Sequence, residues 1–412
     1  MRRNPDYVLR KINNEPYLLV TGEAAAHFKK EIKLNKTGEI IWGFLEDDPS
    51  EEELLNRCYT CFECENDDER KQVKESIAPF IQKLLVAGAV RASALEDYRE
   101  KARNHEKTGG CAENIEINLP LSGRYCVAGL GLDIYGDKNL VFSGMQDFST
   151  EDTCENVQKI ALVKCSEPDS DNFLMHSRFS LAMDAFLTNE KTSFFRGNNG
   201  IVMIFIANAN VRWMYMSYDG SYVEIHYNEI DKETIETEFY DAIRGGFMYY
   251  ASLHGVFAIH SASVNFEDKA VLFSAHSGVG KSTHADMWNR LFGTNYINGD
   301  VNLLAFENEK PVVYGLPWCG TSEAYSKGKF VPGAIVFLKR AEENSVENLT
   351  AEKKTTYLLH RLISPNWDEE QLDRLLNFSE KLADSLDMFR LHCNMENEAA
   401  ELCRKRVQNP HQ

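Results

Sequence analysis

The strongest chemical signal in the chain is a short glycine-containing segment. Residues 275–283 read Ala-His-Ser-Gly-Val-Gly-Lys-Ser-Thr, and the apolar run 269–274 before them predicts a buried strand. A strand, a glycine loop, a Lys-Ser pair and then a helix follow the order of a phosphate-binding P-loop. An ordinary glycine turn before a helix is the alternative, but it gives no reason for Lys281 and Ser282. We therefore expect this segment to bind nucleotide phosphates.

The residues of this loop have distinct expected roles. Successive backbone N–H groups form a concavity that binds anions, and the N-terminus of the following helix adds partial positive charge. Lys281 can reach the terminal phosphates, and the hydroxyl of Ser282 suits Mg²⁺. The first glycine of the usual pattern is replaced by Ala275. The residues expected to bind ATP are Ser277, Gly278, Val279, Gly280, Lys281, Ser282 and Thr283.

Two further polar residues stand in apolar stretches on either side of the loop. His260 lies in a predicted strand before it, and Asp300 interrupts an apolar stretch after it. Asp300 can hold Mg²⁺ through water or accept the proton of an acceptor hydroxyl, and His260 can orient a phosphate or the acceptor. Alone, such a histidine is more often structural and such an aspartate is often a turn cap. Beside the loop they predict Asp300, His260 and Lys281 as catalytic residues, with Ser282 and Asp300 at the metal.

The first ninety or so residues predict a small α+β module. Residues 7–10 and 17–20 are expected to pair as strands around a turn at 13–16, and a third short strand is expected near 27–32. Three helices are expected to follow these strands.

The expected helix boundaries rest on capping residues. The first helix opens at 34–39, with Asn35 or Thr37 as its cap. The second begins at Ser50, with Glu53 as its capping-box partner. A third carries apolar residues at helical spacing and ends at Gly88. Pro79 interrupts its apolar face, which is made of Val73, Ile77, Phe80, Ile81, Leu84 and Leu85.

The rest of the chain divides by composition. A charged segment, 93–114, predicts a linker, and residues 115–230 are strand-rich, with strands expected at 201–207, 211–216 and 222–227. No catalytic constellation stands out in that strand-rich region. A helix is expected from 231 to 253, despite two adjacent glycines, and it opens a domain, 231–412, that contains the loop.

Composition limits the class of protein. The 412 residues are 43% hydrophobic and 11% aromatic, as in globular proteins, and the net charge is −18. This charge argues against a general nucleic-acid or anionic-membrane surface but permits a local basic pocket. No signal peptide or membrane-spanning run is visible, and the ten cysteines are scattered. We therefore expect a cytoplasmic protein in a reducing compartment.

One cysteine cluster needs separate consideration. Cys58, Cys61 and Cys64 have the spacing of some metal sites, but no fourth ligand follows and the chain continues into acidic residues. Several thiolates in acidic surroundings would repel one another. A structural helix end is the favoured interpretation.

The N-terminal segment resembles the PqqD-like family. The resemblance covers roughly residues 1–92 and rests on the 34–42 segment, the acid-capped second helix and the Phe80, Leu84, Gly88 ending. It implies a winged-helix-like module that holds the leader of a ribosomally made precursor peptide. The leader would add as a strand near 27–33, beside a groove lined by the third helix. Binding of another protein or of DNA is the alternative, and the acidic stretches argue against binding of DNA.

The segment around the loop resembles the bacterial HPr serine kinase family. His260, the 275–283 loop and the pair Gly299-Asp300, in this order and spacing, carry the resemblance. It is strong over about 250–345 and weaker to about 400. It implies a P-loop kinase domain related to the phosphoenolpyruvate carboxykinase fold, which uses ATP and Mg²⁺. Related kinases tend to be oligomers, so a homo-oligomer is compatible with it.

The chain departs from that family in three places. Ser261 replaces a glycine after the histidine, Gly299 replaces the first of two aspartates, and no Glu-x-Arg-Gly segment follows. The second change leaves both base and metal roles to Asp300. In place of the missing segment stands 316–321, where Trp318 could line the acceptor pocket or simply pack. Glu323 is a candidate second carboxylate.

Together these features predict a multidomain α/β protein with one main function. The first module captures a precursor peptide by its leader, and the second phosphorylates a Ser or Thr hydroxyl using ATP. Tethering would raise the local concentration of the core peptide toward millimolar. Two alternatives remain open at this point: a regulatory kinase or phosphorylase of a folded carrier protein, and an ATP-gated peptide chaperone without phosphoryl transfer.

Overall fold

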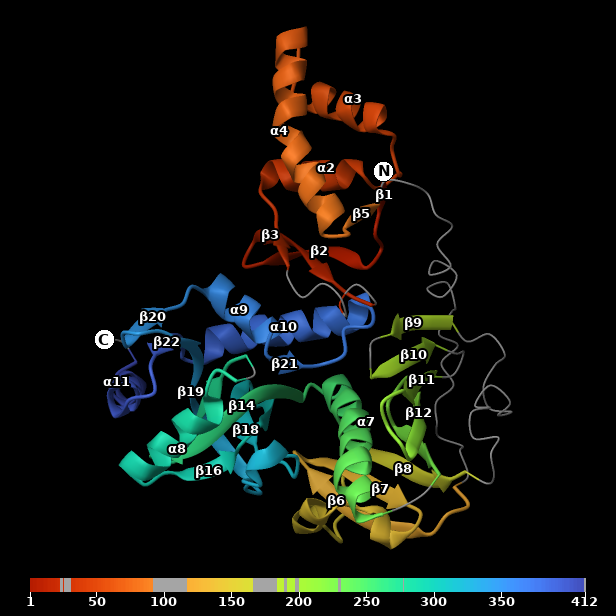
Figure 1. Ribbon diagram of the computed structural model, residues 1–412, viewed down its shortest axis with the longest axis vertical. Coiled ribbons are helices and arrows are strands. Elements are labelled where there is room, and N and C mark those ends of the chain that lie inside the picture. Colours follow the sequence, from red (N-terminus) through yellow and green to blue (C-terminus); the bar gives the residue numbers. More distant parts are fainter. Residues whose placement is uncertain are drawn as a thin grey trace. The chain divides into compact units, whose positions relative to one another are not determined.

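The computed structural model shows a mixed α/β protein with several sheets (Figure 1). It describes residues 1–22, 25, 31–91, 117–165, 184–188, 191–196, 200–228, 231–276 and 278–410. The expected linker at 93–114 and Ser277 lie outside these residues. The chain forms two compact units: unit 1 comprises Met1–His105, Phe186–Thr188 and Asn366–Asp373, and unit 2 the remainder. Among the described residues, no helix has the length and apolar character needed to cross a bilayer.

Among its described residues, unit 1 contains a three-stranded antiparallel sheet and three helices. The expected hairpin is confirmed, and its turn residues Asn13 and Asn14 both have positive φ, which asparagine tolerates better than most side chains. The third strand is short, and residues 26–30 before it lie outside the described part. Its elements are β1 (Arg2–Arg3), β2 (Tyr7–Ile12), β3 (Glu15–Val20), β4 (Ile32–Lys33), α2 (Lys36–Phe44), α3 (Glu51–Cys61), α4 (Asp67–Val86) and β5 (Val90–Arg91).

The helix caps of unit 1 follow the sequence closely. Asn35 caps α2 by accepting from the Gly38 amide, and Ser50 with Glu53 forms the predicted capping box of α3. The interruption expected at Pro79 is wrong, because α4 runs through that residue to Val86. A proline removes one backbone donor, and here the apolar packing of the helix outweighs that loss.

The three clustered cysteines occupy different environments. Cys58 is fully buried in the unit 1 core, whereas Cys61 is exposed at the end of α3. Burial raises the pKa of Cys58 to about 11, so it remains a thiol and acts as a small apolar residue.

The strand-rich region forms an eight-stranded sheet. The three strands expected in this region are confirmed. Two short 3₁₀ helices, η2 (Lys138–Leu140) and η3 (Ser143–Phe148), follow its second strand. In spatial order the strands are β6 (Leu121–Val127), β7 (Leu130–Tyr135), β8 (Val157–Lys164), β13 (Tyr222–Tyr227), β12 (Val211–Ser217), β11 (Gly200–Phe205), β10 (Thr192–Arg196) and β9 (Asp184–Thr188).

A helical segment connects this sheet to the second sheet. It contains α6 (Lys232–Thr234), a π-helical turn η6 (Ile235–Phe239) and α7 (Tyr240–Leu253). The single helix expected over 231–253 is therefore correct in extent but is interrupted by the π turn. α7 contacts β8 and β12 (Figure 1).

The second sheet of unit 2 has nine strands, and five of them pair in a closed circle: β15, β14, β17, β18 and β19. The bounds of its strands are β14 (Phe257–Phe266), β15 (Lys269–Ser274), β16 (Asn295–Asn298), β17 (Val301–Glu307), β18 (Lys310–Tyr314), β19 (Lys329–Arg340), β20 (Ser345–Asn348), β21 (Leu362–Ile363) and β22 (Met388–Cys393). Its helices are α8 (Lys281–Phe292), η7 (Gly320–Ser322), α9 (Ala351–Leu359), α10 (Glu369–Ser385) and α11 (Asn397–Gln408).

Alternate residues of β14 face two different cores. Phe257 and Ile259 belong to the core shared with α9 and α10, whereas Ala262 and Val264 belong to the core under α8 and α11. Because successive side chains of a strand point to opposite faces, His260 shares the α8 side with Ala262 and Val264. The alternation thus directs the histidine toward the helix that follows the glycine loop.

Candidate functional site

The glycine loop joins β15 to α8 as the sequence predicts. Gly278 and Gly280 have φ of 75° and 114°, values that disfavour other residues, and Gly280 is the N-cap of α8. The cap residue has no side chain, and the first helical hydrogen bond is donated by the His284 amide to the Gly280 carbonyl (2.9 Å). The backbone amides that precede His284 in the first turn therefore have no acceptor within the helix. The Arg340 guanidinium holds the Gly278 carbonyl. Such a helix end suits an anion.

Lys281 stands at this helix end as a buried cation. Lys281 is 9% exposed, and among the described residues no carboxylate lies within ion-pair distance of its ammonium group. Burial lowers the pKa of Lys281, nearby Asp300 opposes that effect, and Arg361 adds to it. An ammonium that is partly removed from water and has no carboxylate partner is costly, and a bound anion would offset that cost.

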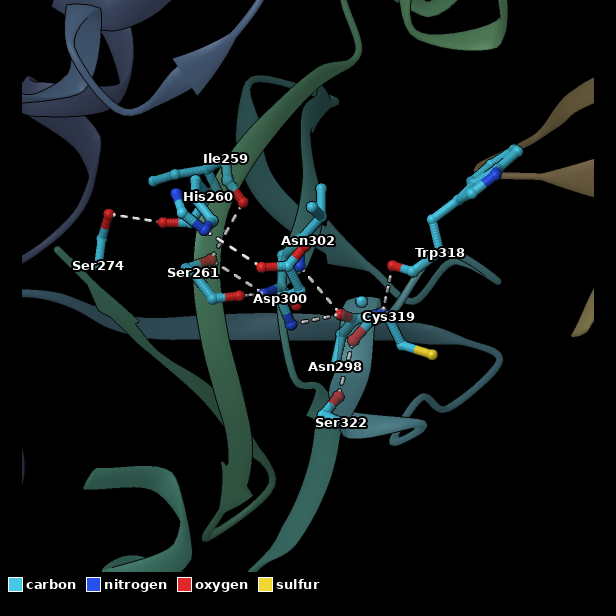
Figure 2. A network of polar contacts seen from close by, with 12 residues as sticks. Ile259, His260, Ser261, Ser274, Asn298, Asp300, Asn302, Trp318, Cys319 and Ser322 are labelled. Atoms are coloured by element: carbon cyan, nitrogen blue, oxygen red, sulfur yellow. Dashed lines mark hydrogen bonds and ion pairs between the residues drawn. The ribbon is translucent and has the colours of Figure 1, made fainter. Parts of the chain in front are cut away.

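His260 and Asp300 meet across the strands β14 and β17. His260 Nε2 lies 3.1 Å from Asp300 Oδ1, and the Ser261 amide donates to the Asp300 carbonyl at 2.9 Å (Figure 2). The hydrogen bond from His260 lowers the pKa of Asp300, burial opposes this, and Lys281 and Arg244 lower the pKa further. Asp300 is therefore an ionised carboxylate at neutral pH, able to accept a proton or hold a cation.

A buried polar network fixes the backbone around Asp300. Asn298 Oδ1 accepts from the amides of Asp300 (2.9 Å) and Val301 (3.0 Å), and its Nδ2 donates to two carbonyls of the 316–318 segment. Asn302 donates to Ser261 O (2.8 Å) and accepts from Ser263 Oγ (2.6 Å). Figure 2 shows Asn298 and Asn302 of this network beside Asp300. Satisfied buried hydrogen bonds of this kind hold one geometry.

Two glycines beside Asp300 exclude other side chains. A Cβ at Gly299 would overlap the Ser322 hydroxyl, and a Cβ at Gly320, where φ is 61°, would come within 2.9–3.0 Å of the Asp300 side chain. Gly299 therefore leaves no room for a second carboxylate at that position, so Asp300 is the only carboxylate that the pair Gly299-Asp300 can supply.

Arg361 completes the group of charged residues around the loop. Its carbonyl accepts from the His260 amide (3.0 Å), and its guanidinium donates to His276 Nδ1 (3.3 Å). The His260 carbonyl in turn accepts from Ser274 Oγ (2.8 Å) at the start of the loop. His260 thus connects, through its backbone and side chain, the loop entrance, Arg361 and Asp300.

Neither Trp318 nor Glu323 has the position expected of a residue that lines an acceptor pocket. Trp318 is fully buried, stacks on Phe247 (5.2 Å between ring centroids) and donates from Nε1 to Tyr240 O (3.1 Å), so packing is the correct interpretation. Glu323 is exposed and has a positive φ of 54°.

The structure brings together most of the residues singled out from the sequence. His260 is hydrogen-bonded to Asp300, and Lys281 of the loop from Gly278 to Thr283 lies close enough to lower the pKa of Asp300, while Ser277 lies outside the described residues. Sequence reasoning missed Arg361 and Asn298. The Asn-Gly pair before Asp300 was a turn signal for Asn298. Arg361 stands in no motif.

The available oxygens fit the Mg²⁺ that a P-loop implies. The Ser282 hydroxyl is exposed on the first turn of α8, and the Asp300 carboxylate is ionised. Mg²⁺ prefers such oxygens and usually keeps several water and phosphate ligands, so it needs few from the protein. Within the described ranges, no group of three or more acidic, histidine or cysteine side chains could form a closed metal cage.

Comparisons with known proteins add a weak likeness to solved structures. No family model matches the chain, and no curated protein matches it. Among solved structures, the HPr(Ser) kinase/phosphatase from Coxiella burnetii is similar at 12% identity and a TM-score of 0.22, covering 38% of this chain and 99% of that one. A likeness at this level is too low to support a functional argument, which rests instead on the geometry of the site.

Proposed function

We propose that the protein is an ATP-dependent kinase that phosphorylates a Ser or Thr hydroxyl of a precursor peptide. The observation that carries the proposal is Lys281, a buried cation without a direct counter-ion at an uncapped helix N-terminus, near a carboxylate that is hydrogen-bonded to a histidine. This combination provides a phosphate site and a proton acceptor together.

The proposed reaction uses each group in turn. The amides of the loop and Lys281 bind the phosphates of ATP, and Mg²⁺, held by Ser282 and Asp300, would neutralise phosphate charge. The acceptor oxygen forms a bond to the γ-phosphorus while the bond to the β–γ bridging oxygen breaks, which releases ADP. The hydroxyl proton goes to Asp300, whose lowered pKa keeps it ionised and whose position His260 fixes.

Unit 1 is proposed to bind the leader of the peptide. It presents a groove of about 480 Å³ between α3 and α4, lined by apolar side chains and a few polar ones. Such a groove can take the apolar side chains of a peptide, whose backbone can pair with a strand edge such as β4. The groove lining includes Leu54, Leu55, Ile77, Ile81 and Leu85.

The proposal is tested by incubating the protein with ATP, Mg²⁺ and its cognate precursor and measuring an added phosphoryl group by mass spectrometry. Asp300→Asn should still bind ATP through the loop and Lys281 but slow transfer roughly 10²- to 10⁴-fold, because it removes the proton acceptor. ATP binding without any transfer by the wild-type protein would favour the chaperone alternative. Absence of ATP binding would end the kinase proposal.

A further inference from the structure

Met395 is an exposed apolar side chain that lies against the glycine loop. It belongs to the turn between β22 and α11 and is 52% exposed. A Cβ built on Gly280, the N-cap of α8, would lie 3.5 Å from the Sδ and Cε atoms of Met395. A single apolar residue on a surface is ordinary, but this one borders the backbone that is proposed to bind phosphates. Its sulfur and methyl group therefore form part of the wall of that site.

The turn that carries Met395 is held by hydrogen bonds on both of its sides. Before it in the chain, the Asn394 amide donates to Asn344 Oδ1 (3.0 Å) in the loop after β19. After it, Asn397 Oδ1 at the start of α11 accepts from Arg290 of α8 (2.6 Å). The backbone is thus tied to the sheet and to α8, while the side chain of Met395 remains accessible. A ligand that contacts this side chain does not have to order the turn first, which lowers the entropic cost of binding.

The order of the strands puts Met395 on the side of the loop away from Asp300. β15, which leads into the loop, pairs with β14 on one side and with β19 on the other, and β22 follows β19. On the first side, β14 carries His260, whose ring is hydrogen-bonded to Asp300. On the second side, Arg340 at the end of β19 donates to the Gly278 carbonyl, and Met395 follows β22. β15, β19 and β22 are parallel, so all three end where the loop leaves the sheet.

We propose that Met395 binds the base of the nucleotide. This inference rests on the proposed function, which places the terminal phosphoryl group near Asp300, the proton acceptor. The rest of the nucleotide then extends across the loop in the opposite direction, toward β19 and β22, and its base reaches Met395. The polarisable thioether of methionine packs favourably against an aromatic ring. Met395 thus adds apolar contact with the nucleoside to a site whose other groups are polar or charged.

The test compares ADP with pyrophosphate, which has two linked phosphates but no nucleoside. Calorimetry with Mg²⁺ should show that Met395→Ala weakens ADP binding about fivefold, since one contact between a methionine sulfur and an aromatic ring contributes about that much. The affinity for pyrophosphate should not change. Met395→Leu keeps an apolar side chain and should lose less affinity for ADP. The matched control is Val331→Ala, which removes an exposed apolar side chain of β19 paired with Lys269, at the end of β15 away from the loop, and it should change neither affinity.

A second measurement uses the wild-type protein alone. Hydrogen peroxide oxidises the Met395 thioether to the sulfoxide and is itself reduced to water, and mass spectrometry of the peptide that contains Met395 follows the rate. ADP with Mg²⁺ should slow this oxidation, because the base covers the sulfur. Pyrophosphate with Mg²⁺ should leave the rate close to that of the free protein.

Three results would overturn the inference. Equal weakening of ADP and pyrophosphate binding by Met395→Ala would make the residue a support of Gly280. Unchanged ADP affinity, or equal protection of Met395 from oxidation by the two ligands, would place the base elsewhere while the phosphate site stands. If the wild-type protein binds neither ligand, the proposed function fails first and the base site fails with it. A thermal unfolding midpoint shows whether each variant is folded, and the oxidation measurement decides the matter if Met395→Ala is not.

Discussion

At the scale of residues, the site depends on what surrounds Asp300. Its carboxylate is held by His260, its backbone by Asn298, and its neighbours Gly299 and Gly320 leave no space for other side chains. A single ionised carboxylate therefore stands near several cations. In a chain of net charge −18, this local excess of positive charge is what a phosphate site requires.

The crowding at Gly299 gives a prediction at this scale. Gly299→Asp should destabilise unit 2 by about 1–3 kcal/mol, because the new Cβ overlaps the Ser322 hydroxyl and forces the η7 turn to move. Chemical denaturation measures the loss. The double variant Gly299→Asp/Ser322→Gly should recover most of it. If the single variant is as stable as the wild type, the turn is less tightly packed than the structure shows.

At the scale of elements, α8 combines an open N-terminus with a packed inner face. Tyr296 donates to Ser282 O (3.2 Å) and Asp286 Oδ1 (2.7 Å) and so ties the first turn of the helix to β16. His284, one turn into the helix, packs edge-on against Phe273 (4.9 Å between ring centroids), and its Nε2 has no partner among the described residues. The helix is thus fixed while its first amides remain available for a ligand.

The buried histidine of α8 predicts a pH dependence of stability. Burial lowers the pKa of His284 from 6.5 to about 4, so in this interval the unfolded chain binds a proton that the folded chain does not. Its stabilising effect is complete above pH 6.5 and is lost as pH falls toward 4. Between pH 7.5 and pH 5 this group should remove about 2 kcal/mol of the free energy of unfolding.

The measurement is denaturation of the wild type and of His284→Leu at both pH values. The change in the free energy of unfolding between the two pH values should be smaller in the variant by that amount, whatever the variant does to stability at pH 7.5. His360→Leu, which removes an exposed histidine, is the control and should keep the wild-type difference. An unchanged difference in His284→Leu would mean that folding does not lower the pKa of this ring.

At the scale of the whole molecule, the proposal assigns capture and chemistry to different units. Unit 1 has its own core and groove, and unit 2 contains every described residue of the candidate phosphate site. Tethering by a leader raises the effective concentration of the acceptor, so unit 2 needs few contacts of its own with the peptide. The division predicts that damage to the groove affects peptide binding rather than the chemical step.

The variant Ile81→Glu tests this division. A charge in the groove between α3 and α4 should raise KM for the full precursor by about tenfold or more, since a buried apolar contact is replaced by a desolvated carboxylate. KM for a leaderless peptide and ATP affinity should not change. Ile40→Glu, on an exposed part of α2 outside the groove, is the control. An equal effect of both variants would show that the groove has no special role.

Much of the local structure was predictable because it depends on neighbours in the sequence. The strand before the glycine loop, the helix after it, the cap at Asn35 and the capping box at Ser50 were all correct. The sequence did not predict that α4 continues through Pro79 or that a π turn precedes α7, because packing against the rest of each unit decides both features. Periodicity and capping are local properties, whereas packing is not.

The sequence by itself determined the kind of chemistry that we propose, because a lysine and a hydroxyl after a glycine turn can bind phosphate through groups that are adjacent in the chain. Only the tertiary structure decided how His260 and Asp300 meet, that Trp318 packs, that Gly299 excludes a second carboxylate and that Arg361 stands beside the loop. These contacts join residues far apart in the chain. They exist because β14 pairs with other strands along both of its edges, and no local pattern records which strands those are.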